Sequence, residues 1–297
     1  MSIVLESPCR RDRNSDPLEF EPVRLTDLDQ MRRLVQSARL YGNDVNYANL
    51  FLLQRKHRIT ICFRGGFLFR RYDGPYRQGY GFPVGSGDWN EALQAIEQDA
   101  QDFRRPLDFC LLTENQKTIL EYYRPRQRQY QTDRGDSDYV YSRDDLANLP
   151  GRKYQRKRNA IHRFINDYPD WRFEPLSVDA PSPLFDDVRS IVNAWFDFHE
   201  GAADPSLRSE FDAIRTALFY FKELNLTGGV LYAGRQPAAF SLASPTLDNV
   251  YDIHFEKAIP EIPQAYAMIC HATAQFLTSA RLINREEDVN EPGLRKA

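Results

Sequence analysis

The sequence lacks the features by which secreted, membrane-spanning and disulfide-rich proteins are identified. No stretch approaches about 18 uninterrupted apolar residues, so no segment is predicted to span a bilayer. The N-terminal residues up to Asp16 contain no apolar core long enough for a secretory signal peptide. No two cysteines form a CxxC pair, and Cys62, Cys110 and Cys270 lie in apolar segments, as buried thiols of a reducing compartment do. We therefore expect a cytoplasmic protein, at most peripheral to a membrane.

The charge balance excludes a protein that coats nucleic acid with its whole surface. The chain has 39 basic and 42 acidic residues, a net charge of −3 and a pI of about 6.0. Any contact with nucleic acid must therefore be a local basic patch. Hydrophobic residues make up 42% of the 297 residues, which is enough for a sizeable core and for about two domains.

The hydrophobic pattern predicts two halves of mixed α/β type. Helical spacing and alternation predict, in the first half, helices at 27–40, 88–103 and 114–123, a hairpin at 58–72 and a strand at 107–112. In the second half they predict helices at 184–199 and 207–224, a hairpin at 229–243, a strand at 249–256, a helix at 263–279 and a strand at 281–284. Two helices, antiparallel strands, then a helix and a strand is the element order of the GNAT acyltransferase fold.

We therefore predict an α/β (α+β) architecture of tandem GNAT-like domains, each a mixed, mostly antiparallel sheet flanked by helices. Its parts are a frayed N-terminus at 1–18, an N-terminal domain at 19–135 and a C-terminal domain at 136–297 that begins with a basic bridging helix. Fold alone does not determine function.

The bridging segment is strongly basic. Six residues between positions 152 and 163 are basic and none is acidic: Arg152, Lys153, Arg156, Lys157, Arg158 and Arg163. On a helix, Arg152, Arg156, Asn159 and Arg163 share the face opposite an apolar stripe, and Lys157 and Arg158 border that stripe. In one interpretation the outer face binds phosphates and the two bordering cations enter a cleft between the halves. In the other, the helix is simply solvated and its cations reach water.

The strand at 249–256 carries ionisable residues at alternate positions. Regular alternation places Asp252, His254 and Glu256 on one face, where His254 beside either carboxylate suits general acid–base chemistry. Side chains two apart are about 6.6 Å apart at the backbone and those four apart about 13 Å, so one ion would reach two of them at best. We therefore predict no metal site. The structural alternative is a wet crevice lined by this face.

Several separated motifs resemble, in order, the C-terminal domain of phosphatidylglycerol lysyltransferase. They are Asp138-Tyr139-Val140-Tyr141, Leu146-Ala147-Asn148-Leu149 with Gly151-Arg152-Lys153, Lys157-Arg158-Asn159 with Phe164, His254-Phe255-Glu256-Lys257-Ala258, and Asn284-Arg285-Glu286-Glu287-Asp288 with Gly293-Leu294-Arg295-Lys296-Ala297. Gln264 and Asn290 stand where the family tends to carry glycine. The family's transmembrane part is absent, and we expect the closing strand of the sheet to be missing or supplied by another segment.

The resemblance implies a tandem GNAT-like fold and, through kinship with Fem-type peptidyltransferases, transfer of an aminoacyl group from aminoacyl-tRNA. The donor is then a co-substrate, no cofactor is required, and the acceptor is an unidentified lipid headgroup, peptide or small amine. We assign three groups of residues on this basis: Arg152, Lys153, Arg156 and Arg163 to tRNA phosphates; Tyr139, Tyr141, Lys157, Arg158, Asn159, Lys257, Asn284, Arg285, Glu286 and Asp288 to substrate; and His254, Glu256 and Asp252 to catalysis.

Two other functions remain open. An acyl-CoA-dependent N-acyltransferase should carry a glycine-bearing pyrophosphate loop after the strand at 249–256, but the junction from Lys257 to Gln264 contains no glycine. A catalytically silent binding protein on the same scaffold is the third hypothesis.

Overall fold

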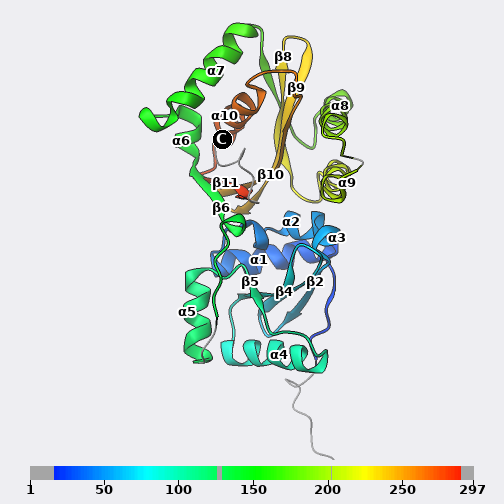
Figure 1. Cartoon of the computed structure of the whole chain (residues 1–297), viewed down its shortest axis with the longest axis vertical. Helices are drawn as coiled ribbons and strands as arrows, with labels where there is room; N and C mark the ends of the chain where they lie inside the picture. Colours follow the sequence, from blue (N-terminus) through cyan, green and yellow to red (C-terminus); the bar gives the residue numbers. More distant parts are fainter. Residues whose placement is uncertain (1–16, 126–128, 202, 289–297) are drawn as a thin grey trace, which may run out of the picture.

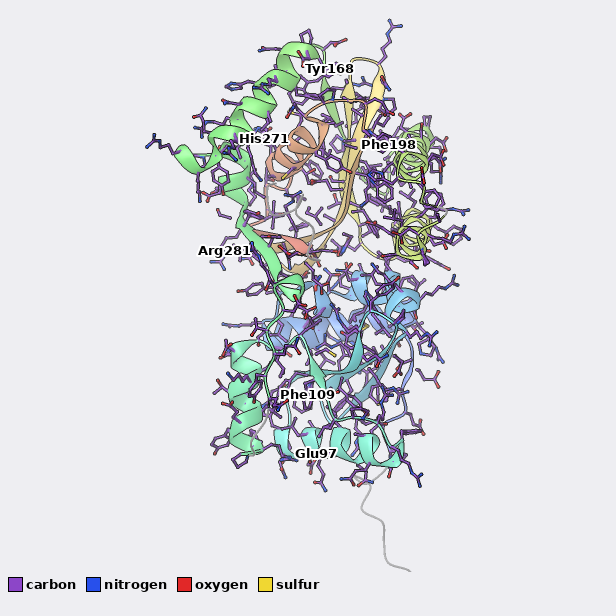
Figure 2. All side chains as sticks on the ribbon, in the orientation of Figure 1. Glu97, Phe109, Tyr168, Phe198, His271 and Arg281 are labelled. Carbon is purple, nitrogen blue, oxygen red and sulfur yellow. The ribbon has the colours of Figure 1, made fainter. Side chains whose placement is uncertain are left out.

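The structure, a computed structural model, describes residues 17–125, 129–201 and 203–288. It is elongated, with one sheet in each half (Figure 1). Glu97 and Tyr168 lie near opposite ends of the long axis (Figure 2). Of the N-terminus that was predicted to be frayed, Pro17 and Leu18 are described, and Leu18 is buried.

The N-terminal half contains a five-stranded sheet in the order β1-β2-β3-β4-β5. Its elements are β1 (Glu21–Pro22), α1 (Leu28–Ala38), α2 (Tyr47–Leu52), α3 (Gln54–His57), β2 (Ile59–Arg64), β3 (Phe67–Asp73), β4 (Gln78–Gly85), α4 (Trp89–Asp102), β5 (Phe109–Cys110) and α5 (Glu114–Tyr123). Leu28, Met31 and Val35 form the buried stripe of α1, as their spacing predicts. Asp88 begins α4 by accepting hydrogen bonds from the backbone amides of Asn90 and Glu91.

The C-terminal half contains a six-stranded sheet in the order β6-β11-β10-β9-β8-β7. Its elements are β6 (Asp138–Ser142), α6 (Arg143–Asn148), α7 (Gln155–Asp167), β7 (Arg172–Leu176), α8 (Ser182–Phe198), α9 (Pro205–Phe219), β8 (Thr227–Ala233), β9 (Gln236–Leu247), β10 (Val250–Ala258), α10 (Ala265–Phe276) and β11 (Leu282–Glu287). Helices α6, α7 and α10 cover one face of this sheet, and α8 and α9 cover the other (Figure 1). The edge beside β11 is occupied by β6, so a segment from earlier in the chain supplies that strand.

The parallel strands β10 and β11 separate partway along their length. They are paired only over Val250–Asp252 and Leu282–Asn284, although both strands continue further. A β-bulge between Ile253 and Phe255 bends β10, and Glu286 in β11 has a left-handed φ of 62°. We call the point of separation, after Asp252 and Asn284, the fork.

The bulge also changes which residues share a face of β10. Ile253 packs with α6 and α10, whereas Phe255 packs in the core that contains α8 and α9. In a regular strand these two side chains would face the same side. The prediction that Asp252, His254 and Glu256 share one face is therefore wrong for Glu256, which pairs with Arg285, whereas Asp252 and His254 both contact the amide of Asn49.

The two halves share a hydrophobic core. One cluster of buried side chains joins Met31 and Leu50 of the first half to Ile214, Phe240 and Phe255 of the second. The predicted architecture, two mostly antiparallel sheets flanked by helices, is confirmed. The predicted domain boundary at residue 135 remains a prediction.

Candidate functional site

A cleft of about 1500 Å³ opens at the fork, between the C-terminal sheet and the N-terminal half. The residues of β10 and β11 that line it lie beyond the separation, from Ile253 to Lys257 in β10 and from Arg285 to Glu287 in β11. The N-terminal half closes the cleft with residues that include Asn49, His57 and Arg77. The separation of two parallel strands therefore creates the space, and both halves supply its walls.

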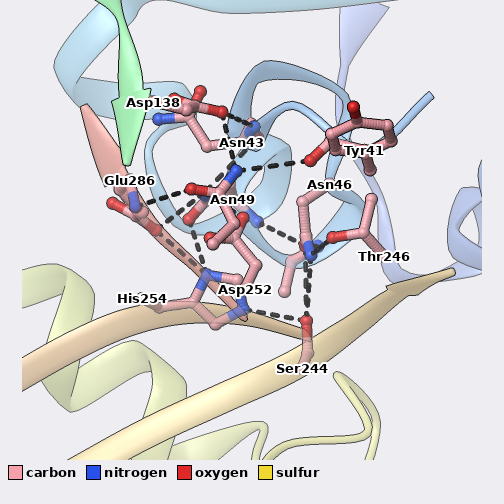
Figure 3. Close-up of polar contacts among 12 residues, drawn as sticks. Tyr41, Asn43, Asn46, Asn49, Asp138, Ser244, Thr246, Asp252, His254 and Glu286 are labelled. Atoms are coloured by element: carbon pink, nitrogen blue, oxygen red, sulfur yellow. Dashed lines mark hydrogen bonds and ion pairs between the residues drawn. The ribbon is translucent and has the colours of Figure 1, made fainter. Parts of the chain in front are cut away.

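His254 is the centre of a buried polar network at the fork (Figure 3). Its Nδ1 lies 2.9 Å from Asn49 Oδ1 and 3.3 Å from Glu286 Oε1. Its Nε2 lies 2.8 Å from Ser244 Oγ. The carboxylate in contact with the imidazole is thus Glu286, from β11, whereas the sequence suggested Glu256 or Asp252.

Asn49 ties the two halves together at this point. Its Nδ2 donates to Glu286 Oε1 at 2.9 Å and to Asp252 Oδ2 at 3.2 Å (Figure 3). Asp252 is fully buried, and its other oxygen, Oδ1, has no hydrogen-bond partner among the residues that the structure describes. Burial, and then the neighbouring Glu286, raise the pKa of the Asp252 carboxyl well above its usual range.

Ser244, His254 and Asn49 have the spacing of a nucleophile, base and orienting group, at 2.8 Å and 2.9 Å. However, Ser244 is completely buried, and its hydroxyl also accepts a hydrogen bond from Asn46 Nδ2. A substrate in the cleft cannot reach such a hydroxyl. Ser244 therefore orients the imidazole and does not act as a nucleophile.

Glu256 and Arg285 form an ion pair of 2.6 Å, and both line the cleft beyond the fork. Lys157 of α7 lies close to them, with its ammonium 5.5 Å from the centre of the Tyr141 ring. Burial, together with the positive charge of Arg285, lowers the pKa of Lys157 below its usual value. Within the described part of the chain, no hydrogen bond or ion pair occupies this ammonium, so it is available to a ligand.

The basic segment, a short 3₁₀ turn over Arg152–Tyr154 followed by α7, divides between the cleft and the surface. Arg156 and Lys157 line the cleft. For Lys157 this agrees with the interpretation in which the cations that border the apolar stripe enter a cleft between the halves. Arg158 does not line it, because its guanidinium donates to the carbonyls of Leu149 and Gly151 and so fixes the turn before α7. The remaining basic side chains, with Asn159, are exposed: Arg152, Arg163 and Lys153, which pairs with Asp145 at 2.8 Å.

The other residues predicted to bind substrate are held by neighbours in the protein. Lys257 lines the cleft but pairs with Glu210 at 2.6 Å and lies 4.2 Å from the Trp195 ring centre. Tyr139 donates to buried Asp288 at 2.5 Å.

Asn284 is buried beside β6. It donates to Asp138 at 2.7 Å. Tyr139, Asp288 and Asn284 therefore lie outside the lining of the cleft, where their hydrogen bonds stabilise the strands that form the fork. The motif at 293–297 and Asn290 lie outside the described residues.

The sequence analysis did not identify the contribution of the N-terminal half. Asn43, Asn46 and Asn49 follow one another at intervals of three, and all three side chains are buried. This spacing places polar groups on one side of a helical turn in an otherwise apolar segment, which was the available signal. Asn46 begins α2 by accepting from the backbone amides of Ala48 and Asn49, so it orients Asn49 toward the fork.

Comparison with known proteins supports the resemblance. A family model described as the C-terminal domain of phosphatidylglycerol lysyltransferase matches residues 36–297. No curated protein gives a significant match.

Solved structures similar to this chain include three with TM-scores above 0.5. A conserved protein of unknown function from Bacteroides thetaiotaomicron is 29% identical with a TM-score of 0.85, and the match covers 94% of this chain and 93% of that one. The C-terminal domain of a putative lysylphosphatidylglycerol synthetase from Agrobacterium fabrum is 15% identical with a TM-score of 0.58, covering 88% and 77%. L-PGS from Bacillus licheniformis is 11% identical with a TM-score of 0.61, covering 87% and 78%. The last two likenesses show the fold alone.

Among the described residues, no helix has the length and apolarity needed to cross a bilayer.

Proposed function

Because the chain belongs to the family of the phosphatidylglycerol lysyltransferase C-terminal domain, we propose that it transfers an aminoacyl group from aminoacyl-tRNA to an acceptor bound in the cleft. The observation that carries this proposal is the position of Arg156 and Lys157. Both belong to the basic segment, and both line a cleft built by the two halves. A basic helix that was merely solvated would turn its cations away from such a cavity.

The proposed reaction needs few chemical groups. The nucleophilic oxygen or nitrogen of the acceptor attacks the ester carbonyl of the donor, a new acyl bond forms, and the ester bond to the terminal ribose breaks. The acceptor loses a proton and the ribose oxygen gains one. Catalysis then consists of holding the two reactants in line and of stabilising the negative charge that develops on the carbonyl oxygen.

The cleft offers groups for each of these tasks. Lys157 is the candidate for the developing negative charge, because its ammonium lies in the cleft without an ion-pair partner in the described residues. The polar groups at the fork, His254 with Glu286, are the candidates for moving the proton. Glu256 is engaged by Arg285, so we propose that this pair shapes the cleft rather than accepting a proton.

Donor binding can be tested before the acceptor is known. We expect the full-length protein to retain aminoacyl-tRNA on a nitrocellulose filter more strongly than deacylated tRNA, and Lys157→Met to weaken the retention about tenfold. Lys222→Met is the matched control, because Lys222 is an exposed lysine outside the basic segment and outside the lining of the cleft. Thermal stabilisation by acetyl-CoA, without retention of aminoacyl-tRNA, would instead support an acyl-CoA-dependent enzyme. If neither donor binds, the transferase proposal fails.

A further inference from the structure

The fork brings together three side chains of metal-ligating type that the sequence separates. Asp252 and His254 come from β10, and Glu286 comes from β11. One ligand atom from each lies within 4.8 Å of the other two. Spacing along one strand could not predict this cluster, because its third member belongs to the neighbouring strand and the bulge moves His254 toward it.

The distances from His254 to Glu286 and to Asn49 suit coordination of one ion. With bonds of about 2.1 Å, adjacent ligands around a metal lie about 3.0 Å apart and opposite ligands about 4.2 Å apart. His254 Nδ1 is 2.9 Å from Asn49 Oδ1 and 3.3 Å from Glu286 Oε1, in the range for adjacent ligands. Asn49 can thus provide a fourth ligand through its amide oxygen, although its Nδ2 now donates to Asp252 and Glu286 and the amide must turn.

Negative charge at the fork is not balanced as it is elsewhere around the cleft. Asp44, Glu256 and Glu287 each pair with a buried or half-buried guanidinium, those of Arg70, Arg285 and Arg77. Within the described residues Asp252 has no basic partner, and Glu286 has only His254. The Asp252 side chain is fully buried and its Oδ1 has no hydrogen-bond partner in the described part of the chain. Burial of a carboxylate oxygen without a hydrogen-bond partner raises the free energy of the folded protein, and coordination of a cation would offset this cost.

The surroundings orient these ligands. Ser244 Oγ lies 2.8 Å from Nε2 of His254 and can accept a hydrogen bond from Nε2–H. In that tautomer the lone pair of Nδ1 is directed at the cluster. The left-handed backbone at Glu286 is unfavourable for a residue with a side chain, and it turns the carboxylate toward His254. His254 and Glu286 line the cleft, so an ion can enter from solvent.

We propose that the fork binds one divalent transition-metal ion through Asp252, His254 and Glu286, with Asn49 as a further ligand. One imidazole nitrogen together with carboxylate and amide oxygens suits Mn²⁺ or Zn²⁺. The sequence analysis predicted no metal, and the position of Glu286 is the reason for this revision. The proposal deepens the proposed function and revises one role in it: a bound ion would take the place of the proton on Nδ1, so His254 and Glu286 would hold the metal rather than move a proton, and the ion would polarise the donor carbonyl or the acceptor. The binding itself does not depend on that reaction.

The test is direct metal binding by the full-length protein. After treatment with EDTA and gel filtration, the protein is titrated with MnCl₂ or ZnCl₂ by calorimetry, and bound metal is counted by mass spectrometry after dialysis. We expect one ion per chain, and a loss of affinity of tenfold or more in Asp252→Asn and Glu286→Gln. Glu210→Gln is the matched control, because Glu210 is another cleft carboxylate that pairs with Lys257 away from the fork.

A second measurement covers variants that fold poorly. Addition of Co²⁺ to the wild-type protein should produce visible absorption bands of a nitrogen- and oxygen-ligated ion, and Zn²⁺ should abolish them. Absence of stoichiometric binding by the wild-type protein, or equal binding by the fork variants and Glu210→Gln, overturns the proposal. Because no tRNA is present, this failure would leave the result of the donor-binding experiment unchanged.

Discussion

The carboxylate of Glu256 lies 2.6 Å from the guanidinium of Arg285, and this ion pair links β10 to β11 beyond the point where their pairing ends. The side chains are only 8% and 16% exposed. Strands that separate to form a cleft lose the hydrogen bonds that fix their distance. The ion pair therefore holds the mouth of the fork at a defined width.

Removal of one partner should destabilise the protein more than removal of both. We expect Glu256→Ala to lower the free energy of unfolding by about 3 kcal/mol, because it leaves a buried guanidinium unpaired. The double variant Glu256→Ala with Arg285→Ala should lose less than the sum of the two single variants. Urea unfolding of all four proteins measures this coupling. Strictly additive losses would show that the pair does not act as a unit.

The ammonium of Lys157 should lose its proton at lower pH than an exposed lysine. Burial lowers the pKa of Lys157, whereas a hydrogen bond from Lys153 to Asp145 raises the pKa of Lys153. Since only the neutral amine is acylated, labelling with an amine-specific reagent across a pH series should reach half its maximum at lower pH for Lys157. Peptide mass spectrometry measures both residues in one sample. The opposite order would contradict the environment described for α7.

His57 should make the protein sensitive to acid. Burial lowers the pKa of His57 from 6.5 to about 3, so the folded state keeps this imidazole neutral. Between these values the unfolded chain binds a proton that the folded chain does not. Stability from this group is therefore complete above pH 6.5 and decreases as pH falls toward 3, by about 1.4 kcal/mol per pH unit.

The variant His57→Gln should reduce this dependence. We expect the free energy of unfolding, measured with urea at pH 7.5, 6, 5 and 4, to fall less steeply in the variant than in the wild type. Above pH 7 the difference between the two proteins should be constant, which provides an internal control. Parallel curves down to pH 4 would remove His57 as the source.

The sequence predicted most of the longer helices and the hairpins β2–β3 and β8–β9, because their apolar spacing is regular. It did not predict β4, which contains Gly79, Gly81 and Gly85. An added Cβ there would come within 2.6 Å of the carbonyl of Asp108, 2.8 Å of the Arg70 side chain and 2.2 Å of the carbonyl of Gly66. These glycines allow close packing within a strand, and a single sequence does not distinguish this from a turn.

The site was predicted in part. Local chemistry identified His254 and Lys157 as candidates, the family resemblance added Glu286, and all three line the cleft. Their arrangement depends on a bulge in β10 and on a turn of α2 from the other half, and neither follows from alternation or charge. Gln264, where the family tends to carry glycine, has a left-handed φ of 65° at the start of α10. The sequence showed glutamine in place of glycine at this position, but it did not show that the backbone there is left-handed.

The most direct test of the account compares two arginines of one helix. Both side chains are exposed, but Arg156 lines the cleft and Arg163 lies outside the lining, and each is changed to glutamate. Filter binding of aminoacyl-tRNA at fixed salt measures the effect. We expect Arg156→Glu to weaken binding at least tenfold and Arg163→Glu to weaken it clearly less, because phosphate contacts near the cleft position the donor. Equal binding by wild-type protein and Arg156→Glu would contradict a donor site in the cleft.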